Sequence, residues 1–513
     1  MRIGLQHNDS EGFGARHPWP ARMVLLATGA LVPFLFAPFS FWPLALILPV
    51  IFWQLTAAVN PLQAWWHGWW FGAGFFGTGV SWVFFSMRAV QTPIAISLLL
   101  SVLFCLSLAF LFAVQAWLGT QRRGLPAFAI LPLLWLLFEF IRSTLFTGLP
   151  WLLWGTASSN LWLAGWLPIL GVFGVSYLGL ISAGLLWRWL QQPTDRRFAA
   201  ATLTLMVLST AGGWGLQQIE WTQAETRTAL SVSLIQGNVA QDGKWDPVTL
   251  RQDFQRYQDL SEQHPGATLL VWPETAIAAF PEQLQPELSE WDARLRQRQQ
   301  GLIAGMPVWG ENGRFYNAVR GLGTASGEYR KQHLVPFGEY LPFATLLQGV
   351  TAFFDLPMSG FSAGSAAQPM LRIEQDQQIW QLGTLICYEV AYPWLARQQA
   401  AQADALVVVS NDAWFGRSWA PAQHLQISQI RAIENQRAMI RATQNGISAF
   451  IAPNGVIVAQ TEQFIATTLS GEVTARSGLT PYQRWGEWPL ALLVFSFLAT
   501  VLGYARWSKS PRR

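Results

Sequence analysis

The chain has 513 residues and a formal net charge of +4, and 51% of its residues are hydrophobic while only 12% are charged. Because soluble domains usually carry about 25% charged residues, this composition excludes a wholly soluble protein and favours one built into a membrane. The two cysteines lie in very different settings, which argues against a disulfide framework. Neither a Cys-x-x-Cys motif nor a histidine pair at ligand spacing is present, so no metal or cofactor is expected.

Long stretches of the N-terminal part lack Asp, Glu, Lys and Arg. Arg88 is the only such residue between Arg22 and Arg122, and none lies between Arg142 and Arg188. Each stretch accommodates at least one membrane span of about 20 residues. The pattern predicts about eight spans, near residues 23–39, 41–55, 65–87, 93–118, 125–141, 161–186, 198–218 and 488–505.

The basic residues that flank these spans predict the orientation. Arg16 and Arg22 precede the first span, arginine pairs follow the fourth and sixth spans, and the C-terminal tail is basic. Cytoplasmic loops are enriched in Lys and Arg, so with eight spans all these residues lie on the cytoplasmic side. We therefore expect a transmembrane domain over residues 1–220, an extracytoplasmic domain over 224–481, and a last span with its tail over 487–513. Nucleic acid is not an expected partner, because the excess of basic over acidic residues is explained by the arginines and lysine that flank the predicted spans.

The polar segment from about residue 224 to 481 alternates short apolar runs with amphipathic stretches, which indicates an α/β layered domain. Strands are predicted near residues 230–237, 268–272, 301–308, 317–322, 381–387, 405–410, 439–443, 447–451 and 456–459. Helices are predicted near residues 248–263, 281–299, 392–401 and 421–436.

Cys387 is the most informative residue of this segment. It ends the apolar, β-prone run 382–386, and a helix-like stretch begins at Pro393. A nucleophile suits this position, because the side chain is held rigidly and lies beside backbone N–H groups. Cys105, in contrast, lies in an uncharged, leucine-rich run. Cys387 is therefore the candidate thiol nucleophile.

Two further ionisable residues follow predicted strands or lie in ordered contexts. Glu274 follows the strand near 268–272 through Pro273, so it is a candidate to accept the thiol proton. Lys331 is one of only three lysines among 33 basic residues, and a compact ammonium suits a small oxyanion better than a guanidinium does. Oxyanion stabilisation and tuning of the thiol pKa both remain open as the role of Lys331.

Five short motifs carry a resemblance to the nitrilase superfamily, whose catalytic elements are Glu, Lys and Cys. The motifs are Trp272-Pro273-Glu274, Tyr329-Arg330-Lys331, Val335-Pro336-Phe337-Gly338-Glu339, Cys387-Tyr388-Glu389 and Ser410-Asn411-Asp412-Ala413-Trp414-Phe415-Gly416. Their order between the seventh and eighth predicted spans makes the chain similar, along its whole length, to the membrane branch of that superfamily. This branch is the apolipoprotein N-acyltransferase family of bacterial inner membranes.

The resemblance implies an α-β-β-α nitrilase sandwich on eight transmembrane helices, with the catalytic domain on the periplasmic side. It implies transfer of a fatty acyl chain from a phospholipid, through a cysteine thioester, to the α-amino group of the S-diacylglyceryl cysteine of apolipoproteins. By motif position, Glu274 is the implied general base, Lys331 the oxyanion stabiliser and Cys387 the nucleophile. Supporting roles are implied for Glu339, Tyr388, Glu389 and Asn317, and substrate contacts for Trp245, Trp151 and Trp414.

Features of the membrane side bear on the same site. Glu139 and Arg142 lie three residues apart on one helical face, and we interpret them as a structural pair that fixes the following arm, residues 147–151. Trp151 either contacts lipid near an entrance or anchors the arm at the membrane interface. The apolar residues that form either mobile lids or domain core are Phe337, Leu341, Pro342, Phe343, Phe353, Phe354, Trp414 and Phe415.

Three alternative functions stay open. A membrane-tethered amidase would use the same three residues with water as acceptor, although eight spans exceed what a tether requires. A thiol hydrolase would pair Cys387 with His424, and replacement of His424 would then abolish activity while Glu274→Gln would not. A transporter would need several polar residues inside the spans, where only Glu139 and Arg142 come close.

Overall fold

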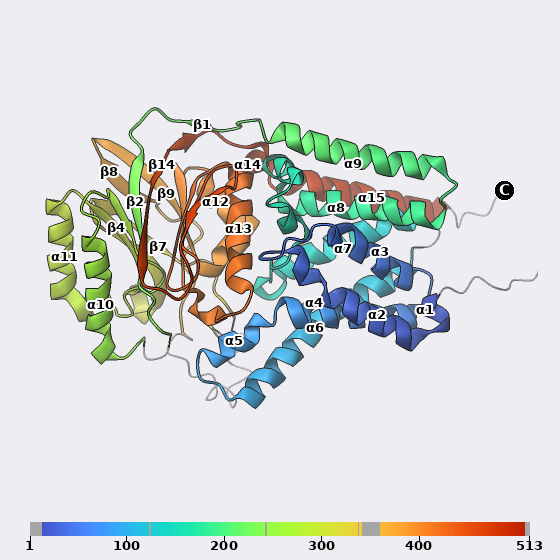
Figure 1. Ribbon diagram of the computed structural model, residues 1–513, viewed down its shortest axis with the longest axis horizontal. Coiled ribbons are helices and arrows are strands. Elements are labelled where there is room, and N and C mark those ends of the chain that lie inside the picture. Colours follow the sequence, from blue (N-terminus) through green and yellow to red (C-terminus); the bar gives the residue numbers. More distant parts are fainter. Residues whose placement is uncertain (1–12, 123–124, 242–243, 337, 341–359, 508–513) are drawn as a thin grey trace, which may run out of the picture.

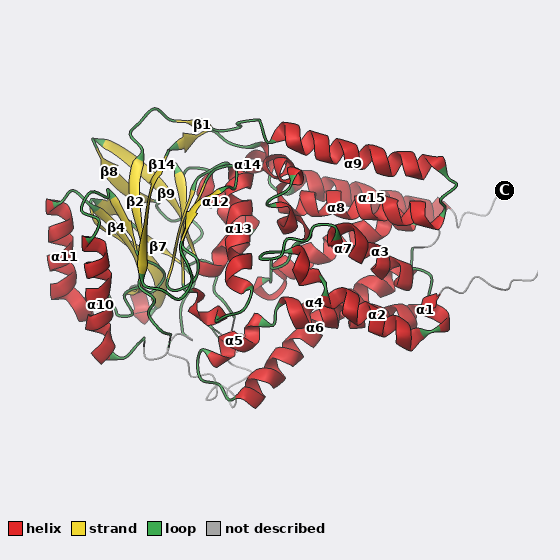
Figure 2. Cartoon of the chain, viewed as in Figure 1, coloured by secondary structure: helices red, strands yellow, loops and turns green. Residues whose placement is uncertain are grey.

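The computed structural model describes residues 13–122, 125–241, 244–336, 338–340 and 360–507. A bundle of apolar helices and a layered α/β domain lie side by side (Figure 1). The last helix of the chain returns from the α/β domain to the bundle, where Leu490 and Val494 pack against an apolar cluster that includes Phe173 (Figure 1). Strands are confined to the α/β domain and helices make up the bundle (Figure 2).

A helix lies in each of the eight stretches that the sequence predicts as spans. The helices of the bundle are α1 (Phe13–Arg16), α2 (Pro18–Ala30), α3 (Leu44–Thr56), α4 (Pro61–Gly79), α5 (Trp82–Arg88), α6 (Ile94–Thr120), α7 (Ala127–Thr144), α8 (Leu167–Gln191), α9 (Arg196–Leu216) and α15 (Trp488–Trp507). Within the described ranges, five helical segments are long and apolar enough to cross a membrane. They are Pro18–Leu35, Ile94–Thr120, Ala127–Thr147, Trp162–Gln191 and Arg196–Leu216.

The predicted span 65–87 differs from the structure, which divides it into two helices. The chain leaves helical geometry at Val80 (φ −119°), so α4 ends and the separate α5 begins. α5 reaches toward the α/β domain, where Phe85 lies against Gly416 (Figure 1). No residue of α5 is fully buried, whereas α4 is buried along one face.

Small residues let the helices of the bundle approach closely. A Cβ added to Gly29 of α2 would lie 2.1 Å from the carbonyl oxygen of Phe71 in α4. A Cβ added to Gly68 of α4 would lie 2.2 Å from the carbonyl oxygen of Phe112 in α6. Apolar side chains gain little by leaving lipid for a helix interface, so this close backbone packing supplies much of the attraction.

Two mixed sheets face each other in the α/β domain. The strands are β1 (Gln223–Ala224), β2 (Leu230–Gln236), β3 (Leu269–Val271), β4 (Gly301–Trp309), β5 (Phe315–Gly323), β6 (Ala325–Ser326), β7 (Glu328–Arg330), β8 (Leu371–Gln375), β9 (Gln378–Ile386), β10 (Ala405–Ser410), β11 (Met439–Thr443), β12 (Ala449–Ile451), β13 (Ile457–Gln460), β14 (Thr467–Val473) and β15 (Arg476–Ser477). One sheet has the order β14-β2-β3-β4-β5-β7 and the other β13-β12-β11-β10-β9-β8-β6. In each, three neighbouring central strands run parallel.

Helices cover both outer faces of this sheet pair, which makes four layers (Figure 1). α10 (Pro247–Glu262) and α11 (Gln285–Gln297) pack on the six-stranded sheet around Trp272 and Trp291. α12 (Pro393–Ala400) and α13 (Ala420–Asn435) cover the seven-stranded sheet, and a shared apolar core joins the two sheets. The short α14 (Pro481–Trp485) leads to α15.

All nine predicted strands and all four predicted helices of this domain are confirmed to within a few residues. The α13 helix also links the two halves of the molecule. Its Gln423 accepts a hydrogen bond from the indole of Trp151 (2.7 Å), and its Glu434 accepts one from the backbone N–H of Val172 in α8 (2.7 Å). The catalytic candidates therefore lie in a domain that is fixed directly to the bundle.

Candidate active site

Cys387 lies at the end of β9, where the strand turns into a short 3-10 helix (Cys387–Ala391). Its φ is +53°, a left-handed conformation that residues with a side chain rarely adopt. Such backbone strain persists only where surrounding contacts hold it, and it concentrates at functional sites. The side chain is buried, at 8% relative exposure. The local geometry therefore resembles the turn that presents a nucleophile at a strand end.

Glu274 follows β3 on the facing sheet and is held by three donors. Its Oε1 accepts hydrogen bonds from Asn317 Nδ2 (2.8 Å) and Lys331 Nζ (3.4 Å). Its Oε2 accepts one from the backbone N–H of Asn411, which follows β10 (2.9 Å). The carboxylate is thus fixed from both sheets, and its position is determined before any substrate arrives.

Lys331 follows β7 and is almost completely buried. Its Nζ lies 2.9 Å from Glu339 Oε1 and 3.4 Å from Glu274 Oε1, so the ammonium bridges two carboxylates. Asn317 Nδ2 donates to both carboxylates as well, at 2.8 Å each, and completes the buried cluster. The supporting residues expected from the sequence, Glu339 and Asn317, therefore contact the expected base and lysine directly.

The electrostatics of this cluster favour a protonated lysine and a protonated thiol. Burial alone lowers the pKa of Lys331, but the charges of Glu339 and Glu274 outweigh it, so the pKa lies above its ordinary value. Burial raises the pKa of Cys387, the charge of Glu274 raises it further, and Lys331 offsets only part of this. The resting nucleophile is therefore a neutral thiol, which needs a base to become reactive.

Glu389 is fully buried and holds the backbone around the site. Its Oε2 accepts from the N–H of Ile386 (2.7 Å), and its Oε1 accepts from the N–H groups of Gln332 (2.6 Å) and His333 (3.1 Å). Burial raises the pKa of Glu389 to about 7 against these donors. The carboxylate thus joins the turn at Cys387 to the loop that carries Lys331.

Tyr388 and Trp151 form an aromatic stack behind the nucleophile. Their rings lie 6.0 Å apart at an interplanar angle of 11°. Trp151 has no exposed surface, so in this conformation it neither faces lipid nor acts as an interfacial anchor. It packs instead against Phe415 and His424 at the joint between the two halves. The expected lipid contact of Trp151 is therefore not available in this arrangement.

Trp245 and Trp414 are half-buried and pack against an apolar cluster of Leu334 and Phe361 beside Lys331. This position keeps both tryptophans available as candidate substrate contacts. Phe415 is buried, which makes it core in this arrangement. The other expected lid residues, Phe337, Leu341, Pro342, Phe343, Phe353 and Phe354, lie outside the described residues.

Glu139 and Arg142 hold the arm, as expected, but through its backbone. Arg142 Nη1 donates to the carbonyl oxygens of Leu149 (2.8 Å) and Trp151, and Glu139 Oε1 accepts from the N–H of Trp154 (2.7 Å). A further contact ties the arm to the site, because His333 Nε2 lies 2.7 Å from the carbonyl oxygen of Thr147.

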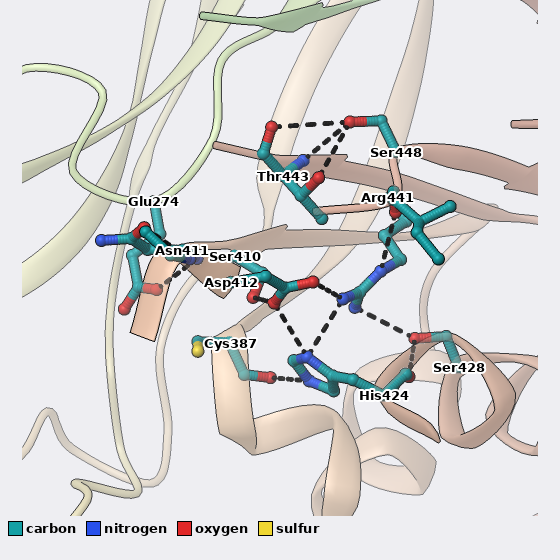
Figure 3. Close-up of polar contacts among 12 residues, drawn as sticks. Glu274, Cys387, Ser410, Asn411, Asp412, His424, Ser428, Arg441, Thr443 and Ser448 are labelled. Atoms are coloured by element: carbon teal, nitrogen blue, oxygen red, sulfur yellow. Dashed lines mark hydrogen bonds and ion pairs between the residues drawn. The ribbon is translucent and has the colours of Figure 1, made fainter. Parts of the chain in front are cut away.

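Two buried basic residues, Lys244 and Arg441, have no place in the sequence analysis. Lys244, although rare by type, received no role there, yet it is buried beside Glu274 and donates to Thr275 Oγ1 (2.7 Å). Asp412 and Arg441 form a buried ion pair (2.9 Å) near Cys387, and His424 lies against both of them (Figure 3). His424 Nε2 lies 3.2 Å from the carbonyl oxygen of Cys387, so the ring faces the backbone rather than the sulfur.

Comparison with known proteins gives matches over both halves of the chain. A carbon-nitrogen hydrolase model matches residues 231–482, and an apolipoprotein N-acyltransferase N-terminal domain model matches residues 28–185. A solved nitrilase-superfamily structure from Saccharomyces cerevisiae aligns with a TM-score of 0.35 and 17% identity over 49% of this chain and 93% of that chain, too distant to carry an argument.

Full-length relatives are much more similar. The apolipoprotein N-acyltransferase of Azotobacter vinelandii is 41% identical over 506 residues, which cover 95% of this chain and 96% of the relative. That of Pseudomonas paraeruginosa is 40% identical over 514 residues, which cover 97% and 99%. At this identity and coverage, the chain belongs to the apolipoprotein N-acyltransferase family.

Proposed function

We propose that the chain transfers a fatty acyl group from a phospholipid to the α-amino group of the N-terminal S-diacylglyceryl cysteine of apolipoproteins. Glu274, Lys331 and Cys387 perform the transfer through a thioester. The observation that carries this proposal is the convergence of Lys331, Asn317 and the Asn411 N–H on Glu274, next to a thiol held in a left-handed turn. Family membership supplies the class of donor and acceptor.

We also propose the topology that goes with this function. Residues 1–220 form seven spans, residues 224–481 form the catalytic domain, and residues 487–513 form the eighth span and a basic tail. The basic flanks support a cytoplasmic location of both chain ends and a periplasmic location of the catalytic domain in a bacterial inner membrane. This arrangement brings the site close to lipid, where both substrates are anchored.

In the first half of the reaction, Glu274 takes the proton of the Cys387 thiol, and the sulfur attacks the ester carbonyl carbon of the phospholipid. The carbonyl oxygen becomes an oxyanion, which the Lys331 ammonium and backbone N–H groups stabilise. The intermediate collapses and expels the lysophospholipid alkoxide, which takes the proton from Glu274. The products are a Cys387 thioester and lysophospholipid. No cofactor is needed, because every proton is moved by these residues.

In the second half, the apolipoprotein amine attacks the thioester carbonyl carbon. Glu274 takes a proton from the amine, the Cys387 thiolate leaves, and the proton returns to the sulfur. The product is an amide, and the enzyme is restored. Water would hydrolyse the thioester, so the burial of Cys387 protects the intermediate. Trp245 and Trp414, half-buried beside Lys331, contact the acyl chain or the acceptor.

The proposal is tested by intact-protein mass spectrometry after incubation of the purified protein with phospholipid. Wild type should gain one fatty acyl group that neutral hydroxylamine removes, and addition of a diacylated peptide with a free N-terminal cysteine amine should then discharge it. The Cys387→Ser variant should show no hydroxylamine-sensitive adduct. Release of free fatty acid without transfer to the peptide would favour the amidase alternative instead.

A further inference from the structure

A fully buried polar cluster lies on the carbonyl side of Cys387 and has no part in the reaction described above. Asp412, His424 and Arg441 have side chains without solvent exposure. Arg441 Nη2 donates to Asp412 Oδ2 (2.9 Å) and lies 3.0 Å from His424 Nδ1. The cluster contacts the backbone of Cys387: Figure 3 shows the Cys387 sulfur on the side of Glu274 and its carbonyl on the side of His424.

The contacts of His424 determine where its proton lies. The Cys387 carbonyl oxygen can only accept, so the Nε2 atom 3.2 Å away carries the hydrogen. Nδ1 lies between two groups, Asp412 Oδ1 at 3.1 Å and Arg441 Nη2 at 3.0 Å, so the ring is held on both sides. Burial and the charge of Arg441 lower the pKa of His424, and the contact with Asp412 offsets part of this effect. A ring whose Nε2 already carries a proton for the carbonyl is not placed to accept the thiol proton.

The Asp412 carboxylate of the cluster is also held by hydrogen bonds. Ser410 donates its hydroxyl to Asp412 Oδ1 (2.7 Å), and Arg441 Nη1 donates to Ser428 Oγ (3.3 Å). Burial alone raises the pKa of Asp412, but Arg441 and His424 lower it below its ordinary value, so the carboxylate is ionised. The ring nitrogen of His424 is thus held by an ion pair that cannot easily rearrange.

The same segment of chain also holds the base. Asn411, between Ser410 and Asp412, donates its backbone N–H to Glu274 Oε2 (2.9 Å), as Figure 3 shows. One three-residue turn at the end of β10 therefore contacts Glu274 on one side and, through Asp412 and His424, the backbone of Cys387 on the other. The distance between base and nucleophile depends on this turn.

We propose that the Asp412–His424–Arg441 cluster positions the nucleophile, with His424 donating its Nε2–H to the Cys387 carbonyl. This bond fixes the peptide plane after Cys387 and so keeps the residue in its left-handed conformation. Because a trans peptide directs its C=O and N–H to opposite sides, the bond also directs the Tyr388 N–H away from His424. His424, Asp412 and Arg441 are positioning residues, since none touches the reacting atoms.

The experiment compares His424→Phe, which removes the donor, with His424→Gln, whose amide nitrogen reaches the position of Nε2. The matched control is His67→Phe, because His67 is also fully buried and its ring also bonds a backbone carbonyl (Leu55, 2.9 Å), but in the helical bundle. Two rates are measured for each protein: single-turnover thioester formation from phospholipid, and alkylation of Cys387 by iodoacetamide, followed by peptide mapping to separate it from Cys105.

We expect His424→Phe to slow thioester formation at least about tenfold with little change in the phospholipid KM, as loss of an interaction that matters only in the transition state requires. His424→Gln should recover most of that rate, and His67→Phe should keep the wild-type rate even where its Tm falls equally. A wild-type acylation rate in His424→Phe would overturn the proposal. So would a His424→Gln variant as slow as His424→Phe, because the imidazole would then act as the base.

The acylation readout rests on the proposed function, whereas the alkylation readout rests on the thiol alone. His424→Phe should change the alkylation rate of Cys387 at least threefold, and His424→Gln should restore it. If wild type forms no thioester but alkylation still responds in this way, the proposed function fails and the positioning role stands. Equal alkylation rates of Cys387 in wild type, His424→Phe and His424→Gln would contradict the positioning role.

Discussion

At the scale of single residues, the two buried lysines beside Glu274 have opposite environments. Lys331 bridges Glu339 and Glu274 as an ion pair, whereas Lys244 has Thr275 as its hydrogen-bond acceptor and only the more distant charges of Glu274 and Asp253. Burial lowers the pKa of Lys244 from 10.5 to about 8, and these charges offset only part of the effect. The two ammonium groups therefore contribute to the free energy of unfolding with opposite sign at pH 7.

This difference predicts opposite effects of the same substitution. A group whose pKa is higher in the folded than in the unfolded protein stabilises the fold at every pH below its unfolded pKa, so Lys331 contributes fully at pH 7. Lys331→Met should therefore lower the free energy of unfolding by roughly 3–5 kcal/mol, because two buried carboxylates lose their ion pair. A lysine whose pKa is lower in the folded protein contributes stability only above its unfolded pKa. For Lys244 this contribution to the free energy of unfolding is lost as the pH falls through about 8. Lys244→Met should therefore keep or raise the Tm at pH 7, measured by thermal unfolding in detergent.

The Lys244 variant also carries a pH signature. The wild-type Tm should gain a contribution from Lys244 between about pH 8 and pH 10.5, and Lys244→Met should lose that rise. A large drop in the Tm of Lys244→Met at pH 7 would contradict the assignment of Lys244 as an unfavourable buried charge.

At the scale of elements, the arm after α7 is tied at both ends. Arg142 binds its backbone from the bundle side, and His333 and Tyr392 contact the carbonyl oxygens of Thr147 (2.7 Å) and Gly148 (3.1 Å) from the α/β domain. The arm thus connects a membrane helix to the loop of Lys331. Its conformation includes positive φ at Phe146 and Thr147, which these contacts must maintain.

Arg142→Met should therefore release the arm. We expect faster cleavage by a protease within residues 145–152 and a Tm several degrees lower, because the buried carbonyl oxygens of Leu149 and Trp151 lose their donor. Glu139→Gln is the matched control, since its amide oxygen can still accept from the Trp154 N–H and should change both quantities little. Equal effects of the two variants would show that charge, rather than the donors of Arg142, holds the arm.

The same scale shows what the sequence could predict. Strands such as β2 and β10 were predicted because they are short apolar runs between turn signals. β14 was missed because Thr467–Val473 is half-exposed at a sheet edge and has little apolar alternation. Glu274, Lys331 and Cys387 can be proposed from the sequence because each follows an element near a recognisable motif. The Asn411–Glu274 contact was not, because it joins residues 137 positions apart and uses a backbone N–H that any residue type supplies.

At the scale of the whole molecule, α13 is the joint between the two halves. Nearly all of its residues are buried, and it faces the sheet on one side and the bundle on the other (Figure 1). Ile430 and Ile433 pack with Leu133, Leu136 and Phe173 of the bundle. The α/β domain therefore buries this apolar face of α13 against the helices of the bundle.

It follows that residues 224–481 produced alone should aggregate. Removal of the bundle exposes Ile430 and Ile433, and an apolar helix face of this kind promotes association. The isolated domain with Ile430→Gln and Ile433→Gln should elute later and closer to monomer size in gel filtration than the unmodified domain. A monodisperse, monomeric unmodified domain would show that α13 does not need the bundle.

The neutral thiol of Cys387 has a consequence for the chemistry of oxidation. In the proposed location outside the cytoplasm, no glutathione pool reduces a sulfenic acid once it forms. Peroxides react with thiolates far faster than with thiols, and a buried sulfur is also hard to reach. Because burial and Glu274 keep the pKa of Cys387 high, the sulfur is reactive only while its proton is on the base. The proposed nucleophile is therefore protected from irreversible oxidation while no substrate is bound.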